Sequence, residues 1–192
     1  FNYTASGRLA EKYFLNRGPT VQLIEKVEEE WIKKHIKINS SDSILDYACG
    51  LGRWSTKLHA KVKKIYAIDI SPQLIHSLKN KNYANVRPIV GSDEIIAQYP
   101  CCFDKIIFAQ GLEFYKNPKT LFKRLHSALS AKGEIYISTW TPELIQGIEG
   151  LNLKKSSVTT VRVSDNKKIT IFCMLRSKKE VHTLLKTAGF KR

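Results

Sequence analysis

The segment SILDYACGLG, residues 43–52, decides the fold of this 192-residue chain. A short run with high β-propensity, Ser43 to Ala48, leads into a loop that carries Gly50 and Gly52, and a helical pattern follows from Arg53 to Ala60. A buried strand that ends in a glycine-containing turn before a helix is how a βα unit begins. The segment therefore predicts the first βα unit of an α/β sheet.

Further short strands and helices alternate downstream of this segment. We expect strands at 64–69, 86–90, 103–109 and 134–139, and helices that begin at Ser71-Pro72 and at Asn117-Pro118. The second of these helices should place Leu121, Leu125, Ala128 and Leu129 on one face and end at Lys132-Gly133. Strands joined through helices by right-handed crossovers form a mostly parallel sheet. The predicted fold class is α/β, a doubly wound Rossmann-like sheet with helices on both faces.

The segments on either side of this core, 43–140, extend a single domain over 1–192. In the amino-terminal segment, 1–40, a helix should follow Gly18-Pro19 and cover the core as a lid. Its predicted inner face is Val21, Ile24, Val27, Trp31 and Ile32, with Glu25, Glu28, Glu29, Lys33 and Lys34 on the other faces. After the fifth strand, 141–176 should hold a hairpin insertion with strands at 158–163 and 168–175, and 177–192 a last helix closed by Gly189.

Composition excludes several classes of protein. The longest apolar runs are too short to span a bilayer, so we expect no membrane association and, by default, a cytoplasmic protein. Four cysteines show no metal-binding spacing, which predicts no metal site. We expect them to be reduced, with Cys101 and Cys102 as small apolar residues at the start of a strand.

The chain carries a net charge of +15, and the excess is concentrated at one end. Residues 151–192 hold eleven basic residues against two acidic ones, a net charge of +9. A nucleic acid is therefore a possible partner of this region, although a basic surface that only maintains solubility explains the charge as well.

The loop after the first strand is the expected ligand site, because ligands of doubly wound sheets bind at the carboxyl ends of the strands. Gly50 and Gly52 allow a ligand to approach the backbone, and Asp69 ends the second strand at the distance typical of a ribose-binding acid. Together these features predict an adenine nucleoside site.

Asp46 favours one nucleoside over another. A carboxylate at the mouth of the loop would repel a pyrophosphate, whereas it attracts the ammonium group of S-adenosylmethionine. The alternative, a dinucleotide, requires residues 50–55 to be fitted to GxGxxG with Ser55 as the last position.

Residues 44–55, ILDYACGLGRWS, resemble motif I of the class I S-adenosylmethionine-dependent methyltransferases. The likeness extends over about 43–140: residues 65–71 resemble the family's second strand, and 103–108 and 117–139 resemble the later elements of its small-molecule-like subgroup. Residues 180–190 show a weaker likeness to the family, in which an ending such as Ala188-Gly189-Phe190 is common. The resemblance implies a transferase with S-adenosylmethionine as cofactor and S-adenosylhomocysteine as product.

The resemblance also implies roles for single residues. Asp46 and Gly50 would lie by the methionine part of the cofactor, Gly52 under the ribose, and Asp69 on the ribose hydroxyls. Ala48 and Cys49, in the same loop, would also contact the cofactor. Ile70 would pack on adenine, Ser92 or Asp93 would reach the adenine amino group, and Gln110 would lie near the methyl-bearing sulfur. For Ser92 and Asp93 a helix cap is an equal alternative.

Two departures from the family pattern stand out. Ala48 replaces a usual glycine, and the family's closing antiparallel strands are missing after Phe190, which indicates either a truncated chain or another task for the hairpin. Tyr3, Tyr13 and Arg17 are candidate lid residues, with Tyr13 the preferred one. Trp140 lines a substrate pocket or packs in the core, and Trp54 should pack against a helix.

Three functions remain open. The first is methyl transfer to a small molecule, the second is methylation of RNA or protein through the basic end, and the third is a binding module without catalysis. Methyl transfer needs no dedicated base unless the acceptor must lose a proton. We assign no catalytic residue: His126 and His182 should lie on the surface, and Glu113 is the one carboxylate near the expected methyl end. The acceptor and the oligomeric state are left open.

Overall fold

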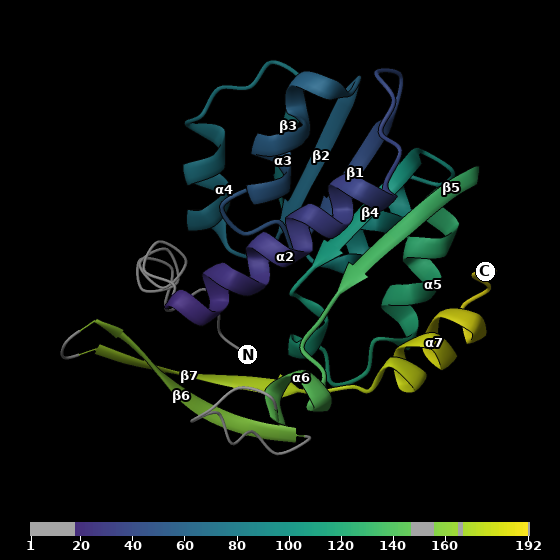
Figure 1. Cartoon of the computed structure of the whole chain (residues 1–192). Coiled ribbons are helices and arrows are strands. Elements are labelled where there is room, and N and C mark those ends of the chain that lie inside the picture. The colour runs from purple at the N-terminus through teal and green to yellow at the C-terminus, as the bar shows by residue number, and fades with distance from the viewer. Residues whose placement is uncertain (1–17, 147–155, 165–166, 192) are drawn as a thin grey trace.

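A computed structural model describes residues 18–146, 156–164 and 167–191. Its centre is a five-stranded parallel sheet in the order β3-β2-β1-β4-β5 (Figure 1). The strands are β1 (Ser43–Tyr47), β2 (Lys64–Asp69), β3 (Val86–Val90), β4 (Phe103–Ala109) and β5 (Leu129–Ser138). The strand order reverses between β1 and β4, so the doubly wound α/β architecture predicted from the sequence is confirmed.

Helices cover both faces of the sheet. On one face, α2 (Pro19–His35) and α3 (Arg53–Leu58) pack on Ile44, Ile65 and Ile107, and α4 (Pro72–Lys79) packs on Ala67. On the other face lie α5 (Lys119–Ala128) and, beside it, α7 (Lys178–Thr187). Short 3₁₀ turns, η2 (His59–Lys61), η3 (Asp93–Gln98) and η4 (Leu112–Phe114), and a one-turn helix α6 (Pro142–Gln146) complete the described elements.

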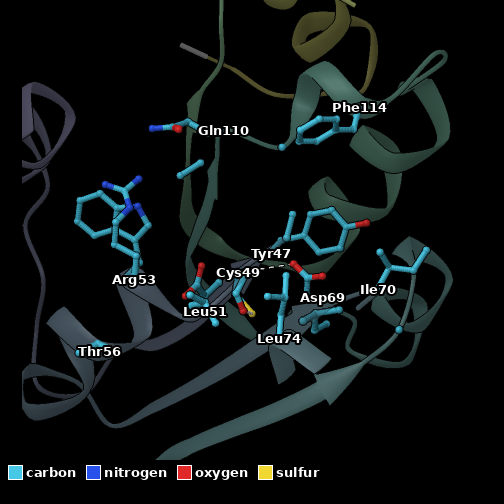
Figure 2. A pocket seen from close by; sticks show the side chains of 18 of the residues that line it. Tyr47, Cys49, Leu51, Arg53, Thr56, Asp69, Ile70, Leu74, Gln110 and Phe114 are labelled. Carbon is cyan, nitrogen blue, oxygen red and sulfur yellow. Dashed lines mark hydrogen bonds between the residues drawn. The ribbon is translucent and has the colours of Figure 1, made fainter. Parts of the chain in front are cut away.

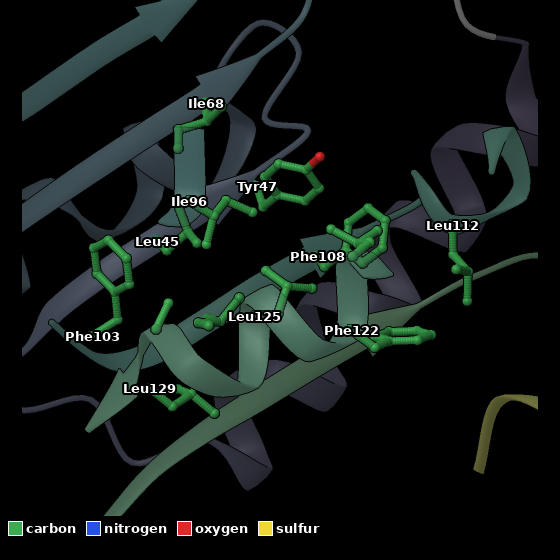
Figure 3. Close-up of a cluster of buried hydrophobic side chains, with 13 residues drawn as sticks. Leu45, Tyr47, Ile68, Ile96, Phe103, Phe108, Leu112, Phe122, Leu125 and Leu129 are labelled. Carbon is green, nitrogen blue, oxygen red and sulfur yellow. The ribbon is translucent and has the colours of Figure 1, made fainter. Parts of the chain in front are cut away.

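The larger hydrophobic core lies between the sheet and α5 (Figure 3). Phe103 and Phe108 of β4 and Phe122 of α5 are fully buried there. Burying a side chain of this size stabilises the fold by about 1.5–3 kcal/mol. This core fixes β4 between β1 and β5 and so fixes the carboxyl ends of these strands, where the ligand site was expected.

The predicted starts of the helices are confirmed. Gly18 caps α2 with Pro19 in its first turn, and Ser71 caps α4 by accepting from the backbone N–H of Leu74. Ser177 and Glu180 form a reciprocal capping box at the start of α7. At Ser71 and Ser177 a side-chain oxygen satisfies a backbone donor that the first turn leaves unpaired, whereas at Gly18 the fixed φ of the following Pro19 favours the helix start.

The predicted end of the helix after Pro118 was wrong. The helix α5 stops at Ala128, and Leu129, expected on its inner face, is the first residue of β5. Leu129 pairs with Phe103 at the start of β4, and the backbone N–H groups of Cys101 and Cys102 donate to Ser127 and Ala128. Pairing with β4 overrides the helical pattern of the sequence at this point.

The predicted inner face of α2 was wrong in part. Val27 and Trp31 are 62% and 53% exposed, whereas the sheet side carries Ile32 together with the half-buried Glu25, Glu28 and Glu29. The true inner face is rotated because the middle of α2 lies beside basic residues of α3, Arg53 and Lys57.

Cys101 and Cys102 were also misplaced. Both are exposed and precede β4, and Cys101 has φ of 53°. Among the described residues, Cys49, Cys101 and Cys102 are free cysteines. Within the described residues, no cluster of side chains could hold a metal ion and no helix is long and apolar enough to cross a bilayer.

The predicted hairpin is confirmed as an antiparallel pair, β6 (Ser156–Ser164) and β7 (Lys167–Met174). It forms a sheet of its own and lies apart from the parallel sheet (Figure 1).

Gly133 in β5 gives a test of the close pairing between β4 and β5. A Cβ at this position would lie 2.8 Å from the carbonyl oxygen of Phe103, and backbone cannot move away as a flexible side chain can. We expect Gly133→Ala to lower the free energy of unfolding by about 1–3 kcal/mol, measured by urea denaturation. Gly18→Ala is the control, because nothing lies within 4 Å of its added methyl. Equal stability of the two variants would contradict this account of the β4–β5 pairing.

Candidate functional site

A pocket of about 600 Å³ opens at the carboxyl ends of β1, β2 and β4 (Figure 2). Its walls come from the loop after β1, the end of β2, the turn after β3, the segment after β4 and the facing parts of α2 and α3. This volume is typical of a site for a small organic ligand. The pocket lies where the reversal of strand order in a doubly wound sheet predicts a ligand.

Nine of the eleven residues predicted for the site line this pocket. They are Asp46, Ala48, Cys49, Gly50, Asp69, Ile70, Ser92, Asp93 and Gln110. Gly52 is not part of the lining: it has φ of 72°, and an added Cβ would lie 2.4 Å from Leu78, so it permits the turn into α3 and the close packing of α4. Tyr13 lies outside the described residues.

Asp69 joins the end of β2 to the loop after β1. Its Oδ2 accepts from the backbone N–H of Gly50 at 2.8 Å, and its Oδ1 accepts from the backbone N–H of Ser71 at 2.9 Å. Burial raises the pKa of this carboxyl, and the hydrogen bonds from Ser71 and Gly50 oppose that rise. The carboxylate therefore fixes the glycine loop and still borders the pocket.

Asp46 points at the start of α3. Its Oδ2 accepts from both the backbone N–H of Ser55, at 2.9 Å, and the Ser55 hydroxyl, at 2.6 Å. Burial raises its pKa from 3.8 to about 6, although the Ser55 hydrogen bonds and Arg53 favour the charged form. The carboxylate thus occupies the position at the helix N-terminus where a phosphate group would otherwise bind.

Two residues of the pocket wall, Ala48 and Gln110, have left-handed backbone conformations, with φ of 54° and 53°. Such conformations cost an ordinary L-residue about 1–2 kcal/mol. Ala48 therefore strains the turn at a position where the family pattern has glycine, and Gln110, just after β4, adds a second strained position. Strain of this kind is common at ligand sites, where surrounding contacts hold the backbone in place.

The turn after β3 has the capping role that the sequence left as an alternative. Ser92 caps η3 by accepting from the backbone N–H of Glu94, and Asp93 pairs with Arg124 of α5. Beside this turn, the large apolar side chain of Ile70 borders the pocket and is 51% exposed. An apolar ring bound here would cover it.

Two long-range contacts that build the site were not predicted. The Tyr47 and Tyr115 hydroxyls form a short hydrogen bond at the pocket wall, and burial raises the pKa of Tyr115 to about 12. The buried Arg176, just after β7, donates to the carbonyls of Leu112, Tyr115 and Lys116 and so holds the segment after β4. Nothing in the spacing of these residues reveals either contact.

A third missed feature is the acidic inner face of α2. Glu25 and Glu28 pair with Arg53, and Glu29 pairs with Lys57, while Glu25, Arg53 and Lys57 also line the pocket. A signal was present in the sequence: Glu25 and Glu29 are four residues apart, as are Arg53 and Lys57, so two helices could align opposite charges.

The remaining candidates are placed as follows. Trp54 packs in the core of α2 and α3, as expected, and its ring also borders the pocket. Trp140 is half-buried and is absent from the pocket lining, and His126 and His182 are exposed, as expected. Glu113 is buried beside Thr139, its pKa is raised to about 7 by burial, and it does not line the pocket.

Asp46 offers a test through pH. Because its folded pKa of about 6 exceeds its ordinary value of 3.8, its ionisation disfavours the folded state progressively as pH rises from about 4 to 6. Asp46→Asn keeps an oxygen that can accept from Ser55 but carries no charge. We expect it to raise the free energy of unfolding by about 2 kcal/mol at pH 7.5, and by less as pH approaches 4, in denaturation series at several pH values. A gain that is independent of pH would show that Asp46 does not titrate in this way.

Ala48 offers a test of backbone strain. Ala48→Gly relieves the left-handed strain and enlarges the conformational freedom of the unfolded chain, two effects of opposite sign. We expect a net gain in stability of up to about 1 kcal/mol, measured by thermal denaturation. Ala67→Gly, in the regular strand β2, is the control and should lose about 1 kcal/mol. A loss at both positions would refute the strain at Ala48.

Comparison with known proteins identifies the family. A family model described as a methyltransferase domain matches residues 22–192. The ubiquinone biosynthesis O-methyltransferase of Xanthomonas euvesicatoria pv. vesicatoria is 25% identical over 138 residues, which are 68% of this chain and 57% of that protein. The enzyme of the same name from Xylella fastidiosa is 27% identical over 129 residues, 64% of this chain and 52% of that protein. The chain thus spans little more than half the length of these relatives.

Solved structures agree on the fold. An S-adenosylmethionine dependent methyltransferase from Mesorhizobium loti has a TM-score of 0.68 at 14% identity, over 84% of this chain and 80% of that one. The complex of DhpI with SAH has a TM-score of 0.71 at 17% identity, over 96% of this chain and 84% of that one. The resemblance seen in the sequence is confirmed. The chain belongs to the methyltransferase domain family, and its fold is that of the class I S-adenosylmethionine-dependent methyltransferases.

Proposed function

We propose that this chain binds S-adenosylmethionine in the pocket at the end of β1 and transfers its methyl group to a small-molecule acceptor. One observation carries the proposal: residues that the family pattern assigns to the cofactor come from four separate segments and meet at this single pocket. Bound there, the cofactor would supply an electrophilic methyl group, and the chain would supply binding, orientation and exclusion of water.

The two ends of the pocket fit the two ends of such a cofactor. Asp69 and the exposed face of Ile70 are matched to ribose hydroxyls and adenine, since a carboxylate accepts hydrogen bonds and an apolar side chain packs on a ring. Arg53 and Gln110 lie away from them (Figure 2), at the end proposed for the methionine part.

Asp46 argues against a dinucleotide. Its carboxylate already accepts from the N-terminus of α3, the group that binds pyrophosphate in dinucleotide folds. A pyrophosphate would have to displace a buried hydrogen-bonded carboxylate. A sulfonium nucleoside places no phosphate there, so the loop favours the methyl donor.

The small-molecule acceptor is supported by the relatives. Proteins named ubiquinone biosynthesis O-methyltransferase share 25% and 27% identity with the matched part of this chain. An oxygen acceptor would have to lose its proton, and we assign no base: Glu113 has a pKa near 7, but its carboxyl is buried outside the pocket lining. The basic residues of 151–192 keep RNA as the second acceptor class to test, through binding that weakens as salt rises.

Calorimetric titration with S-adenosylmethionine, S-adenosylhomocysteine and NAD tests the proposal. We expect the two sulfur nucleosides to bind with dissociation constants in about the micromolar range, and NAD not to bind. Asp69→Asn should weaken both, because the variant loses a charged acceptor, whereas the exposed-site control Glu30→Gln should not. Since Asp69 also holds Gly50 and Ser71, thermal denaturation must show that the variant is folded. Binding of NAD in place of the sulfur nucleosides would refute the proposal.

A further inference from the structure

The outer side of α2 carries an exposed apolar row. Leu23, Val27 and Trp31 are 62%, 62% and 53% exposed, more than any other large hydrophobic side chain among the described residues. They are four residues apart, so they form one row about 12 Å long on the helix surface. Single exposed apolar residues need no explanation, but a contiguous group of them indicates a surface that binds something.

The row faces away from the domain and from the pocket. Figure 1 shows α2 lying across one face of the sheet, and the side of α2 that covers the sheet carries Ile32, which packs with Trp54 in the core. Glu25 of α2 borders the pocket, whereas the three residues of the apolar row do not line it. Binding of a cofactor therefore does not explain their exposure.

A second row of side chains runs beside the apolar row. Lys26, Glu30 and Lys34 each follow a residue of the apolar row by three positions, and all three are exposed. Glu30 is paired with Lys33 at 2.9 Å, so Lys26 and Lys34 give this flank a net positive charge. An apolar row with a basic flank is the pattern of helices that lie on an anionic lipid surface.

We propose that α2 binds the surface of a bilayer that contains anionic lipids. Leu23, Val27 and Trp31 insert between the headgroups, and Lys26 and Lys34 lie against the lipid phosphates. The expectation of no membrane association came from apolar runs too short to span a bilayer, and a helix that lies in the interface needs no such run. This inference goes beyond the proposed function and does not depend on it.

Shape and charge favour lipid over a second copy of this chain. The row is a convex ridge, which a protein partner must match with a groove, whereas fluid headgroups adapt to it. Two copies, each with a net charge of +15, would repel each other, while an anionic surface attracts Lys26 and Lys34. Trp31 also suits the interface, because an indole combines an apolar ring with a polar N–H.

Sedimentation with vesicles tests the proposal. We expect the chain to bind vesicles of equal parts phosphatidylglycerol and phosphatidylcholine, and to bind phosphatidylcholine alone at least about tenfold more weakly. Leu23→Gln combined with Trp31→Gln should lower the affinity for the anionic vesicles about tenfold, because the apolar row is lost. Leu144→Gln is the control, since Leu144 is 37% exposed on α6, outside α2, and this variant should bind as the wild type does.

Charge-matched variants separate binding by α2 from the general attraction of a basic protein. Lys26→Gln with Lys34→Gln, and Lys178→Gln with Lys186→Gln on α7, remove the same charge from exposed positions. The α2 pair should lower the affinity for anionic vesicles at least about tenfold. The α7 pair should lower it less than about twofold, because charges more than a Debye length from the surface are screened.

The fluorescence of Trp31 reports which face is docked. Lipids with a nitroxide close to the headgroup should quench the emission of the wild-type chain. Trp31→Phe keeps an apolar ring in the row and should bind vesicles without this quenching, because Trp54 is buried and Trp140 is half-buried. Quenching that persists in this variant would show that another part of the chain contacts the lipid.

Three further results would overturn the proposal. Vesicle binding that Leu23→Gln with Trp31→Gln leaves unchanged would place the lipid contact outside the row. Self-association that the same variant abolishes, without vesicle binding, would show that a second copy covers the row. A chain that neither binds vesicles nor self-associates would show that the row stays in water. Thermal denaturation checks that each variant is folded, so none of these results depends on the binding of a cofactor.

Discussion

The hydrogen bond from the backbone N–H of Gly50 to Asp69 is the contact on which the site depends. It joins the loop after β1 to the end of β2, two segments that parallel pairing already places side by side. With Asp46 fixed on Ser55 at the start of α3, two buried carboxylates hold the loop open from either end. Burial of these two carboxylates disfavours their charged forms and raises their pKa values. Their presence nevertheless makes the cavity at the sheet edge polar.

The far wall of the pocket depends on ionic packing. The carboxyl-terminal end of α2 reaches the core through Ile32 and the C-cap residue Ile36, whereas the middle of the helix is held by Glu25, Glu28 and Glu29 against Arg53 and Lys57. Partly buried ion pairs add little net stability, because desolvation offsets their attraction. These ion pairs do fix the orientation of the side chains that form them, and here some of these charged side chains border the pocket. The Arg176 contacts to carbonyls of 112–116 do the same for the segment after β4.

The sequence by itself determined the sheet, the helix starts and most of the ligand-facing loop. The strand pattern, Ser71-Pro72 and the glycines at 50 and 52 act through local backbone chemistry, which is readable within a few residues. Nine of the eleven predicted site residues meet at one pocket because the carboxyl ends of strands in a parallel sheet lie at the same edge. The resemblance to the family then assigned a part of the cofactor to the residues at each of these strand ends.

Only the tertiary structure decided the end of α5, the inner face of α2 and the pairs around Arg53. The helical pattern through Leu129 was wrong because strand pairing with Phe103 is a long-range contact that local propensity does not encode. The apolar spacing of α2 predicted an inner face with Val27 and Trp31, but both side chains are exposed. The surface that α2 covers includes basic residues of α3, and glutamates of α2 face them instead. A sequence specifies which charges a chain carries, but which of them become neighbours depends on the crossing of elements far apart along it.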